Sequence, residues 1–165
     1  MDMVYPDRKQ RRLARRSLSF SNARSASPER DRWAIILAGG DGTRLLSLTR
    51  AIAGDDRPKQ FCPILGEETL LDQTRRRVSL AIQVAQTMFS LRENHKAFFE
   101  ELVADVPATN LVVQPTNLGT TPAILYSLLK LSIEDPKAAV GFFPSDHYSR
   151  TTRHSCDTSI QLSQP

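Results

Sequence analysis

The sequence has no long hydrophobic run and few cysteines. No apolar segment in its 165 residues approaches the roughly 18 to 20 residues needed to cross a bilayer, and the N-terminus lacks the apolar core of a signal peptide. The two cysteines, Cys62 and Cys156, lie far apart with no partner spacing, which favours reduced thiols over a disulfide framework or a zinc site. We therefore expect a soluble, cytoplasmic protein without a membrane partner.

The hydrophobic content is sufficient for a folded core. Hydrophobic residues make up 40% of the chain, and a length of 165 residues matches one domain of ordinary size. These values exclude a wholly disordered chain and a disulfide-stapled miniprotein.

The net charge of +4 is concentrated in one segment. Residues 1–32 carry nine basic and four acidic side chains, whereas the remaining 133 residues carry 13 basic and 14 acidic ones. The segment is rich in Arg and Ser and poor in apolar periodicity, which is typical of a disordered, basic leader. Asp2 and Asp7 argue against a mitochondrial transit peptide, and no aromatic interleaving supports a phosphate-binding arm. We expect no nucleic-acid partner.

From Trp33 onward, short apolar runs alternate with helical patterns. Continuous apolar runs are typical of strands buried on both faces of a parallel sheet. The polar stretch after the first run predicts a loop, and Asn94 is the expected N-cap of one of the helices. This alternation predicts an α/β fold, a Rossmann-like open, mostly parallel sheet with helices on both faces. The predicted strands are residues 33–38, 85–91, 111–113 and 138–143, and the predicted helices are residues 69–82, 94–103 and 122–132.

The α/β alternation stops after the fourth predicted strand. Residues 149–165 repeat none of it, and the spacing of His147, His154 and Cys156 matches no zinc pattern. We expect residues 33–148 to be a C-terminally incomplete domain followed by an irregular tail, through truncation or a shifted reading frame.

A glycine-rich segment follows the first predicted strand directly. Residues 37–45 read Leu-Ala-Gly-Gly-Asp-Gly-Thr-Arg-Leu, and glycines at the carboxyl end of such a strand let backbone N–H groups approach a phosphate or a base. The spacing is neither a Walker A motif nor Gly-x-Gly-x-x-Gly. A tight turn alone would explain Gly39 and Gly40, but not Arg44 beside a third glycine. We therefore predict a nucleotide-binding loop.

Three further segments join this loop in a recognisable order. They are Pro-Lys-Gln at residues 58–60, the segment 114–124 that begins Gln-Pro-Thr-Asn-Leu-Gly, and Phe-Pro-Ser-Asp-His at residues 143–147. Together the four segments resemble the sugar-phosphate nucleotidyltransferases, and more closely the mannose-1-phosphate guanylyltransferases, from about Trp33 to Tyr148. The resemblance implies the nucleotide-diphospho-sugar transferase type of fold.

The resemblance also implies a reaction and a set of site residues. A nucleotidyl group would pass from GTP to mannose 1-phosphate, giving GDP-mannose and pyrophosphate, and such chemistry depends mainly on positioning and charge neutralisation. Arg44 would hold the leaving pyrophosphate and Lys59 the attacked phosphate as the catalytic pair, while Asp146 would bind Mg²⁺. The implied nucleotide-binding residues are Gly39, Gly40, Gly42, Thr43, Gln114 and Gly119.

Two alternatives stay open. A glucose-1-phosphate thymidylyl- or adenylyltransferase shares the glycine loop and the lysine. A non-catalytic nucleotide-binding or regulatory fragment is the other reading, because the second metal-binding Asp and the sugar pocket that the family implies are not found in residues 149–165. The sequence is also compatible with a homo-oligomer.

Overall fold

The computed structural model describes residues 32–147, and this part of the chain contains one four-stranded parallel sheet in the order β3-β2-β1-β4. The predicted α/β fold with a parallel sheet is therefore confirmed. The predictions for the leader and for the tail at residues 149–165 concern residues outside this range, apart from Arg32, which begins the first strand. The strands are β1 Arg32–Leu37, β2 Thr87–Arg92, β3 Leu111–Gln114 and β4 Ala139–Pro144.

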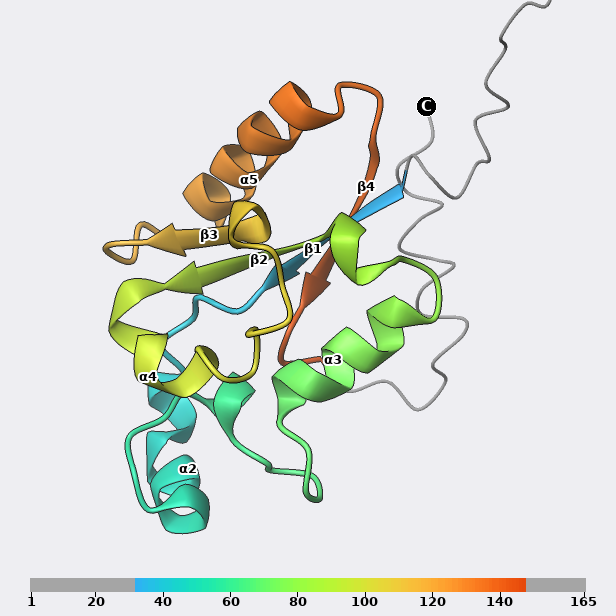
Figure 1. Ribbon diagram of the computed structural model, residues 1–165. Helices are drawn as coiled ribbons and strands as arrows, with labels where there is room; N and C mark the ends of the chain where they lie inside the picture. Colours follow the sequence, from blue (N-terminus) through green and yellow to red (C-terminus); the bar gives the residue numbers. More distant parts are fainter. Residues whose placement is uncertain (1–31, 148–165) are drawn as a thin grey trace, which may run out of the picture.

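Helices cover both faces of the sheet, as the sequence predicts (Figure 1). Helix α5 (Thr120–Glu134) packs on one face, and α3 (Leu70–Ser79) and α4 (Lys96–Phe99) lie on the other. Helix α2 (Leu46–Ala53) lies away from the sheet. Within the described range, no helix combines the length and apolar character needed to span a membrane.

Each strand contributes to two cores because successive side chains point to opposite faces. In β1, Ala34 and Ile36 belong to the cluster that packs under α3 and α4, whereas Ile35 belongs to the cluster under α5. All three side chains are fully buried. This explains why the strand reads as a continuous apolar run in the sequence.

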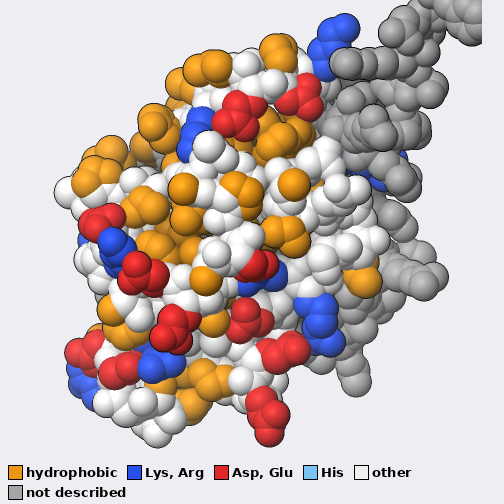
Figure 2. All heavy atoms as spheres, viewed as in Figure 1, with side chains coloured by type: hydrophobic (Ala, Val, Ile, Leu, Met, Phe, Trp, Pro, Cys, Tyr) orange, Lys and Arg blue, Asp and Glu red, His pale blue; other side chains and the backbone are white. Residues whose placement is uncertain are grey.

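Helix α5 approaches the sheet closely through a narrow face. Its buried residues are Ala123, Ser127 and Leu131, one every four residues, and the Ser127 hydroxyl donates to the Ala123 carbonyl at 2.8 Å. In the view of Figure 2, hydrophobic side chains gather over this helix with a few charged side chains among them, and more acidic and basic side chains lie below it. The large exposed hydrophobic residues of α5 are Leu125, Tyr126, Leu129 and Ile133.

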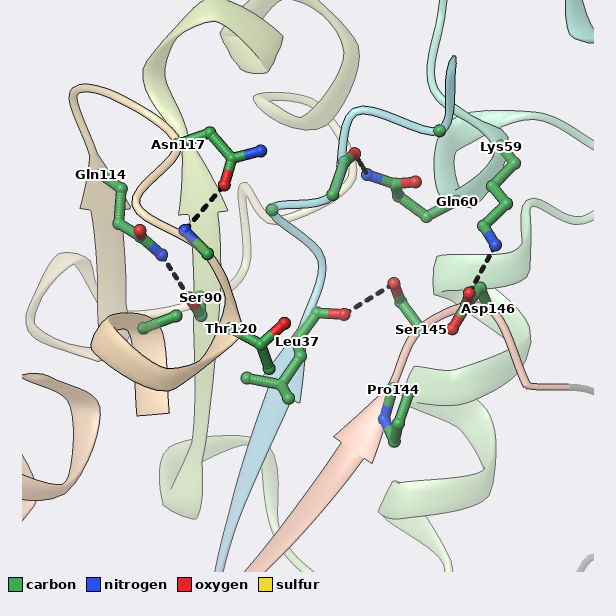
Figure 3. A pocket seen from close by; sticks show the side chains of 15 residues that line it. Leu37, Lys59, Gln60, Ser90, Gln114, Asn117, Thr120, Pro144, Ser145 and Asp146 are labelled. Carbon is green, nitrogen blue, oxygen red and sulfur yellow. Dashed lines mark hydrogen bonds and ion pairs between the residues drawn. The ribbon is translucent and has the colours of Figure 1, made fainter. Parts of the chain in front are cut away.

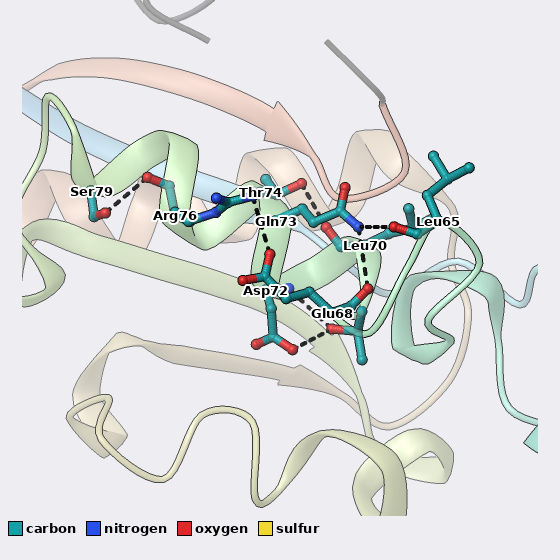
Figure 4. A network of polar contacts seen from close by, with 9 residues as sticks. Leu65, Glu68, Leu70, Asp72, Gln73, Thr74, Arg76 and Ser79 are labelled. Atoms are coloured by element: carbon teal, nitrogen blue, oxygen red, sulfur yellow. Dashed lines mark hydrogen bonds and ion pairs between the residues drawn. The ribbon is translucent and has the colours of Figure 1, made fainter. Parts of the chain in front are cut away.

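Helix α3 begins where the sequence predicts. Thr69 occupies the N-cap position, and its hydroxyl accepts from the Asp72 amide at 3.1 Å and donates to the Asp72 carboxylate at 2.7 Å. Figure 4 shows the surrounding polar contacts, in which the Gln73 side chain donates back to the carbonyl of Glu68. The bond from the Asp72 amide to the Thr69 hydroxyl satisfies one of the backbone N–H groups that the first turn of a helix leaves without partners.

The loop predicted between the first strand and residue 69 is wrong in part, since it contains α2. The helix buries a single residue, Thr49, while Leu48 and Ile52 are each 43% exposed. Helix α2 is eight residues long and directly follows the glycine-rich segment, which the sequence predicts to be the start of a longer loop.

The predicted N-cap at Asn94 is also wrong. Asn94 lies inside the 3₁₀ helix Glu93–His95, and α4 ends at Phe99 instead of near Val103. Turns follow α4, and they place both Val103 and Val106 in the core.

Candidate functional site

A cavity of about 420 Å³ lies at the carboxyl ends of the strands (Figure 3). This is the edge at which open α/β sheets bind ligands, and the volume falls in the range of about 300 to 1,000 Å³ common for small-molecule sites. All four strands or the loops that follow them contribute to its wall. The lining residues are Leu37, Gly39, Gly40, Gly42, Lys59, Gln60, Ser90, Gln114, Asn117, Gly119, Thr120, Ala123, Pro144, Ser145 and Asp146.

The cavity brings together most of the residues that the sequence singles out. Thr43 and Arg44 are outside this set, because they lie on the exposed 3₁₀ helix Thr43–Leu45 that follows the glycine loop. Their assigned roles stay predictions. The predicted residues that line the cavity are Gly39, Gly40, Gly42, Lys59, Gln114, Gly119 and Asp146.

The third glycine of the loop packs against the segment that carries Lys59. Gly42 has φ of +63°, in the left-handed region, and a Cβ placed there would lie 3.1 Å from the Lys59 amide nitrogen. Both features exclude a side chain at this position without local displacement. The close contact therefore fixes the glycine loop against the backbone of Lys59.

Lys59 and Asp146 form an ion pair inside the cavity. The Lys59 ammonium nitrogen is 2.5 Å from Asp146 Oδ2, and the two side chains are 27% and 33% exposed. Burial alone would raise the pKa of the Asp146 carboxyl, but the hydrogen bond and charge of Lys59 lower it overall. Asp146 is therefore ionised at neutral pH, and the cavity presents a cation and a carboxylate side by side (Figure 3).

Gln60 holds the backbone of the glycine loop. Its side chain is 2% exposed, and Nε2 donates to the Ala38 carbonyl at 3.0 Å and to the Gly40 carbonyl at 2.7 Å. The Gln60 side chain thus provides hydrogen-bond donors to two carbonyl oxygens of the loop that would otherwise need partners. This residue follows Lys59 directly, so the loop and the lysine are positioned by one short segment.

The opposite wall of the cavity is ordered by amide side chains. Gln114 Nε2 donates to the Ser90 hydroxyl at 3.1 Å, which links the ends of β3 and β2. The Asn117 side chain accepts from the Gly119 amide at 2.9 Å, which shapes the turn before α5. At the end of β4, Ser145 donates to the Leu37 carbonyl from both its amide and its hydroxyl. These bonds give the cavity a wall of fixed polar groups.

Sequence reasoning did not single out several of these residues as part of the site. Gln60, Ser90, Asn117 and Ser145 act through bonds to backbone or side-chain groups distant in sequence, and no spacing pattern predicts such pairs. The one available signal was position, because Gln60, Asn117 and Ser145 each lie within a segment that also contains a predicted site residue.

Asp146 is the residue of the cavity that is suited to hold a metal ion. Within residues 32–147, no group of three or more His, Cys, Asp or Glu side chains is placed to hold one. The Cys62 thiol is buried away from the cavity lining, and burial raises its pKa.

Comparison with known proteins identifies the family. A family model described as nucleotidyl transferase matches residues 33–161. The chain belongs to the nucleotidyl transferase family. This confirms the resemblance drawn from the four sequence segments, which the structure brings to one edge of the sheet.

Individual relatives agree with this assignment. The alginate biosynthesis protein AlgA of Pseudomonas aeruginosa is 31% identical over 114 residues, which cover 68% of this chain and 23% of that protein. A mannose-1-phosphate guanylyltransferase of Escherichia coli is 27% identical over 115 residues, covering 68% of this chain and 23% of that protein. The chain thus spans about a quarter of the length of these curated relatives.

A solved structure supports the fold. A protein of Thermus thermophilus, described as a mannose-1-phosphate geranyltransferase, superimposes with a TM-score of 0.68 at 24% identity. The match covers 80% of this chain and 37% of that chain. At this level of identity the likeness establishes the architecture of the sheet and helices.

Proposed function

We propose that the cavity binds a nucleoside triphosphate, GTP, for transfer of its guanylyl group to mannose 1-phosphate. The products would be GDP-mannose and pyrophosphate. The observation that carries this proposal is the convergence of the glycine loop, Lys59, Gln114 and Asp146 on one cavity at the carboxyl edge of a parallel sheet. The names of the curated relatives support the choice of guanine nucleotide and mannose phosphate.

The charges in the cavity suit a nucleotide. Phosphate oxygens would take Lys59 as their counter-charge, and charge that develops on the α-phosphate during in-line attack would be stabilised by the same ammonium group. Gln114 and the backbone near Gly119 would meet the base, because they line the wall opposite Lys59 (Figure 3). Thr43 and Arg44, just outside the lining, would contact the leaving pyrophosphate.

Mg²⁺ is the cofactor that this arrangement would accept. Asp146 would hold the ion, since its carboxylate is ionised and lines the cavity beside Lys59. Bound Mg²⁺ would neutralise phosphate charge, which assists transfer of a nucleotidyl group. The roles of Lys59 and Asp146 would then be to hold the phosphates and the ion at the same end of the cavity.

The test is a set of calorimetric titrations paired with an assay of turnover. We expect saturable binding of GTP in the presence of Mg²⁺, with weaker binding of ATP and dTTP. Pyrophosphate release from GTP and mannose 1-phosphate would establish the transfer reaction. Preference for dTTP or ATP with glucose 1-phosphate would support a thymidylyl- or adenylyltransferase, and GTP binding without pyrophosphate release would support a nucleotide-binding module. Absence of binding by all three nucleotides would contradict the proposal.

A further inference from the structure

Asp41 lies in the glycine loop but outside the cavity lining, and it contacts the end of β2 and the loop after β3. Its Oδ2 accepts from Asn117 Nδ2 at 2.8 Å, across 76 residues of sequence. Its Oδ1 forms an ion pair with Arg92, the last residue of β2. One carboxylate therefore connects the loop after β1 to the end of β2 and to the loop after β3.

The contact with Asn117 continues into the cavity wall. The same Asn117 side chain that donates to Asp41 accepts from the Gly119 amide at 2.9 Å (Figure 3). Asn117 and Gly119 both line the cavity on the side assigned to the base. Asp41 is thus linked through Asn117 to the turn before α5.

The side chains that contact Asp41 Oδ1 are largely buried in the protein interior. The Arg92 side chain is 19% exposed, and His95, which is 5% exposed, has Nε2 at 3.6 Å from Asp41 Oδ1. A carboxylate held by a largely buried guanidinium has little freedom to rotate. Asp41 is therefore a fixed point to which the more exposed loop after β3 is attached.

We propose that Asp41 is a positioning residue that couples the glycine loop to the loop at residues 114–119 and so sets the affinity of the cavity for nucleotide. The proposal rests on the proposed nucleotide site and adds a residue that does not contact the ligand. Loss of the Asp41–Asn117 hydrogen bond would free the base side of the cavity while leaving Lys59 and Asp146 in place. GTP binding would then have to order that side of the cavity, and the entropic cost of doing so would weaken the affinity.

The experiment uses the full chain with Asp41→Ala, Asp41→Asn and Asn117→Ala, together with the double Ala variant. GTP with Mg²⁺ is the probe for affinity, and the steady-state ¹⁵N–¹H nuclear Overhauser effect of the Gly119 amide reports the order of the loop. Asp105→Ala is the matched control, because Asp105 pairs with Arg75, whose side chain is 20% exposed, at 2.6 Å and outside the cavity.

We expect Asp41→Ala and Asn117→Ala each to weaken GTP binding about tenfold, as for loss of one hydrogen bond with a charged partner. Both should also lower the order of the Gly119 amide. Asp41→Ala also removes the Arg92 pair, and Asn117→Ala also removes the bond to the Gly119 amide. Because the two variants share the Asp41–Asn117 bond, the loss of affinity in the double variant should be smaller than the product of the two single losses. Asp41→Asn should lose less affinity than Asp41→Ala, since its amide oxygen still accepts from Asn117 although the charge that pairs with Arg92 is gone.

Several results would overturn the proposal. They are losses that multiply in the double variant, an equal loss in Asp105→Ala, or an unchanged Gly119 amide in Asp41→Ala. Should Asp41→Ala fail to fold, Asn117→Ala keeps the Arg92 pair and decides the question by the same two readouts. Failure of the unaltered chain to bind any nucleotide would contradict the proposed function, and the Gly119 amide would still show whether Asp41 orders the loop.

Discussion

Lys59 and Asp146 come from segments far apart in the sequence and meet at 2.5 Å in the cavity. Pairs that are partly exposed to solvent contribute about 0 to 1 kcal/mol to stability, because water screens the attraction. The fold therefore depends little on this pair. Its value is the placement of a cation and a carboxylate where phosphate groups and Mg²⁺ would bind.

Lys59→Ala should weaken GTP binding by about 10- to 100-fold, the effect expected for loss of a charged hydrogen-bonding partner. The free energy of unfolding should change by no more than about 1 kcal/mol. Calorimetric titration and urea unfolding measure the two quantities. Lys96→Ala removes an exposed lysine from α4 and should alter neither. Equal effects of the two substitutions on binding would contradict the assigned role of Lys59.

His95 gives the fold a dependence on pH. Burial lowers its pKa below the ordinary value of 6.5, with a further contribution from the charge of Arg92. The unfolded chain therefore binds a proton near pH 6.5 while folded His95 stays neutral. Stability is fully present above this pH and falls as the pH decreases toward the folded pKa.

Substituting His95 tests this dependence. The free energy of unfolding of the unaltered chain should be lower at about pH 5.5 than at about pH 7.5, and His95→Gln should reduce this difference. The exposed His147 offers the matched control, since His147→Gln should leave the difference in place. An unchanged pH dependence in His95→Gln would show that other groups cause it.

At the scale of single residues, the sequence predicted residues that line the cavity, whereas the hydrogen bonds that hold the cavity wall in place could not be predicted. The roles of the lining residues stay predictions. Lys59, Gln114 and Asp146 were predicted from short segments with a distinctive order of residue types. The contacts of Gln60 and Asn117 could not be predicted, because each depends on the three-dimensional approach of a backbone or side-chain group from another loop.

At the scale of elements, the glycine loop is the segment whose conformation matters most to the site. Gly42 and Gly54 both have positive φ, of +63° and +80°, yet their surroundings differ. A Cβ at Gly42 would lie 3.1 Å from the Lys59 amide nitrogen, whereas nothing lies within 4 Å of a Cβ at Gly54. A substitution at Gly54 therefore tests the effect of backbone strain alone, whereas a substitution at Gly42 tests backbone strain together with the contact to Lys59.

Gly54→Ala should lower the free energy of unfolding by about 1 to 2 kcal/mol, the cost of a left-handed conformation for a residue with a Cβ. It should leave GTP binding unchanged. Gly42→Ala should lower stability further and weaken GTP binding, because the loop and Lys59 must move apart. Urea unfolding and GTP titration of both variants provide the measurements. Matching losses of affinity in the two variants would refute the link between Gly42 and Lys59.

The elements most accurately predicted were the strands. In β1 the side chains are buried on both faces, and in β4 they are buried on one face and partly buried on the other, so both strands read as continuous apolar runs. Helix α2 was missed because it is only eight residues long and follows the glycine-rich segment, which was predicted to begin a longer loop. The predicted length of α4 was too great. The apolar residues Val103 and Val106 continue the helical pattern and are buried in the core, but they lie in the turns that follow the helix.

At the scale of the whole molecule, the described residues form a parallel sheet with a cavity at the carboxyl ends of its strands. The order β3-β2-β1-β4 places the loops after β1, β3 and β4 around it. The family and the fold follow from sequence segments that this topology brings together. The chain spans about a quarter of the length of the curated relatives, so nucleotide binding, turnover and the sugar phosphate are all proposals. Nucleotide binding is the central one, because it concerns the cavity that the described residues form.

The most direct test of this claim maps the GTP site on the ¹⁵N-labelled chain by nuclear magnetic resonance in the presence of Mg²⁺. We expect saturable shifts concentrated at the backbone amides of the cavity and absent from the region around Asp105, which lies outside the cavity lining. No saturable shifts, or shifts centred away from the cavity, would contradict the account. The amides expected to shift are those of Gly39, Gly40, Gly42, Lys59, Gln114, Gly119 and Asp146.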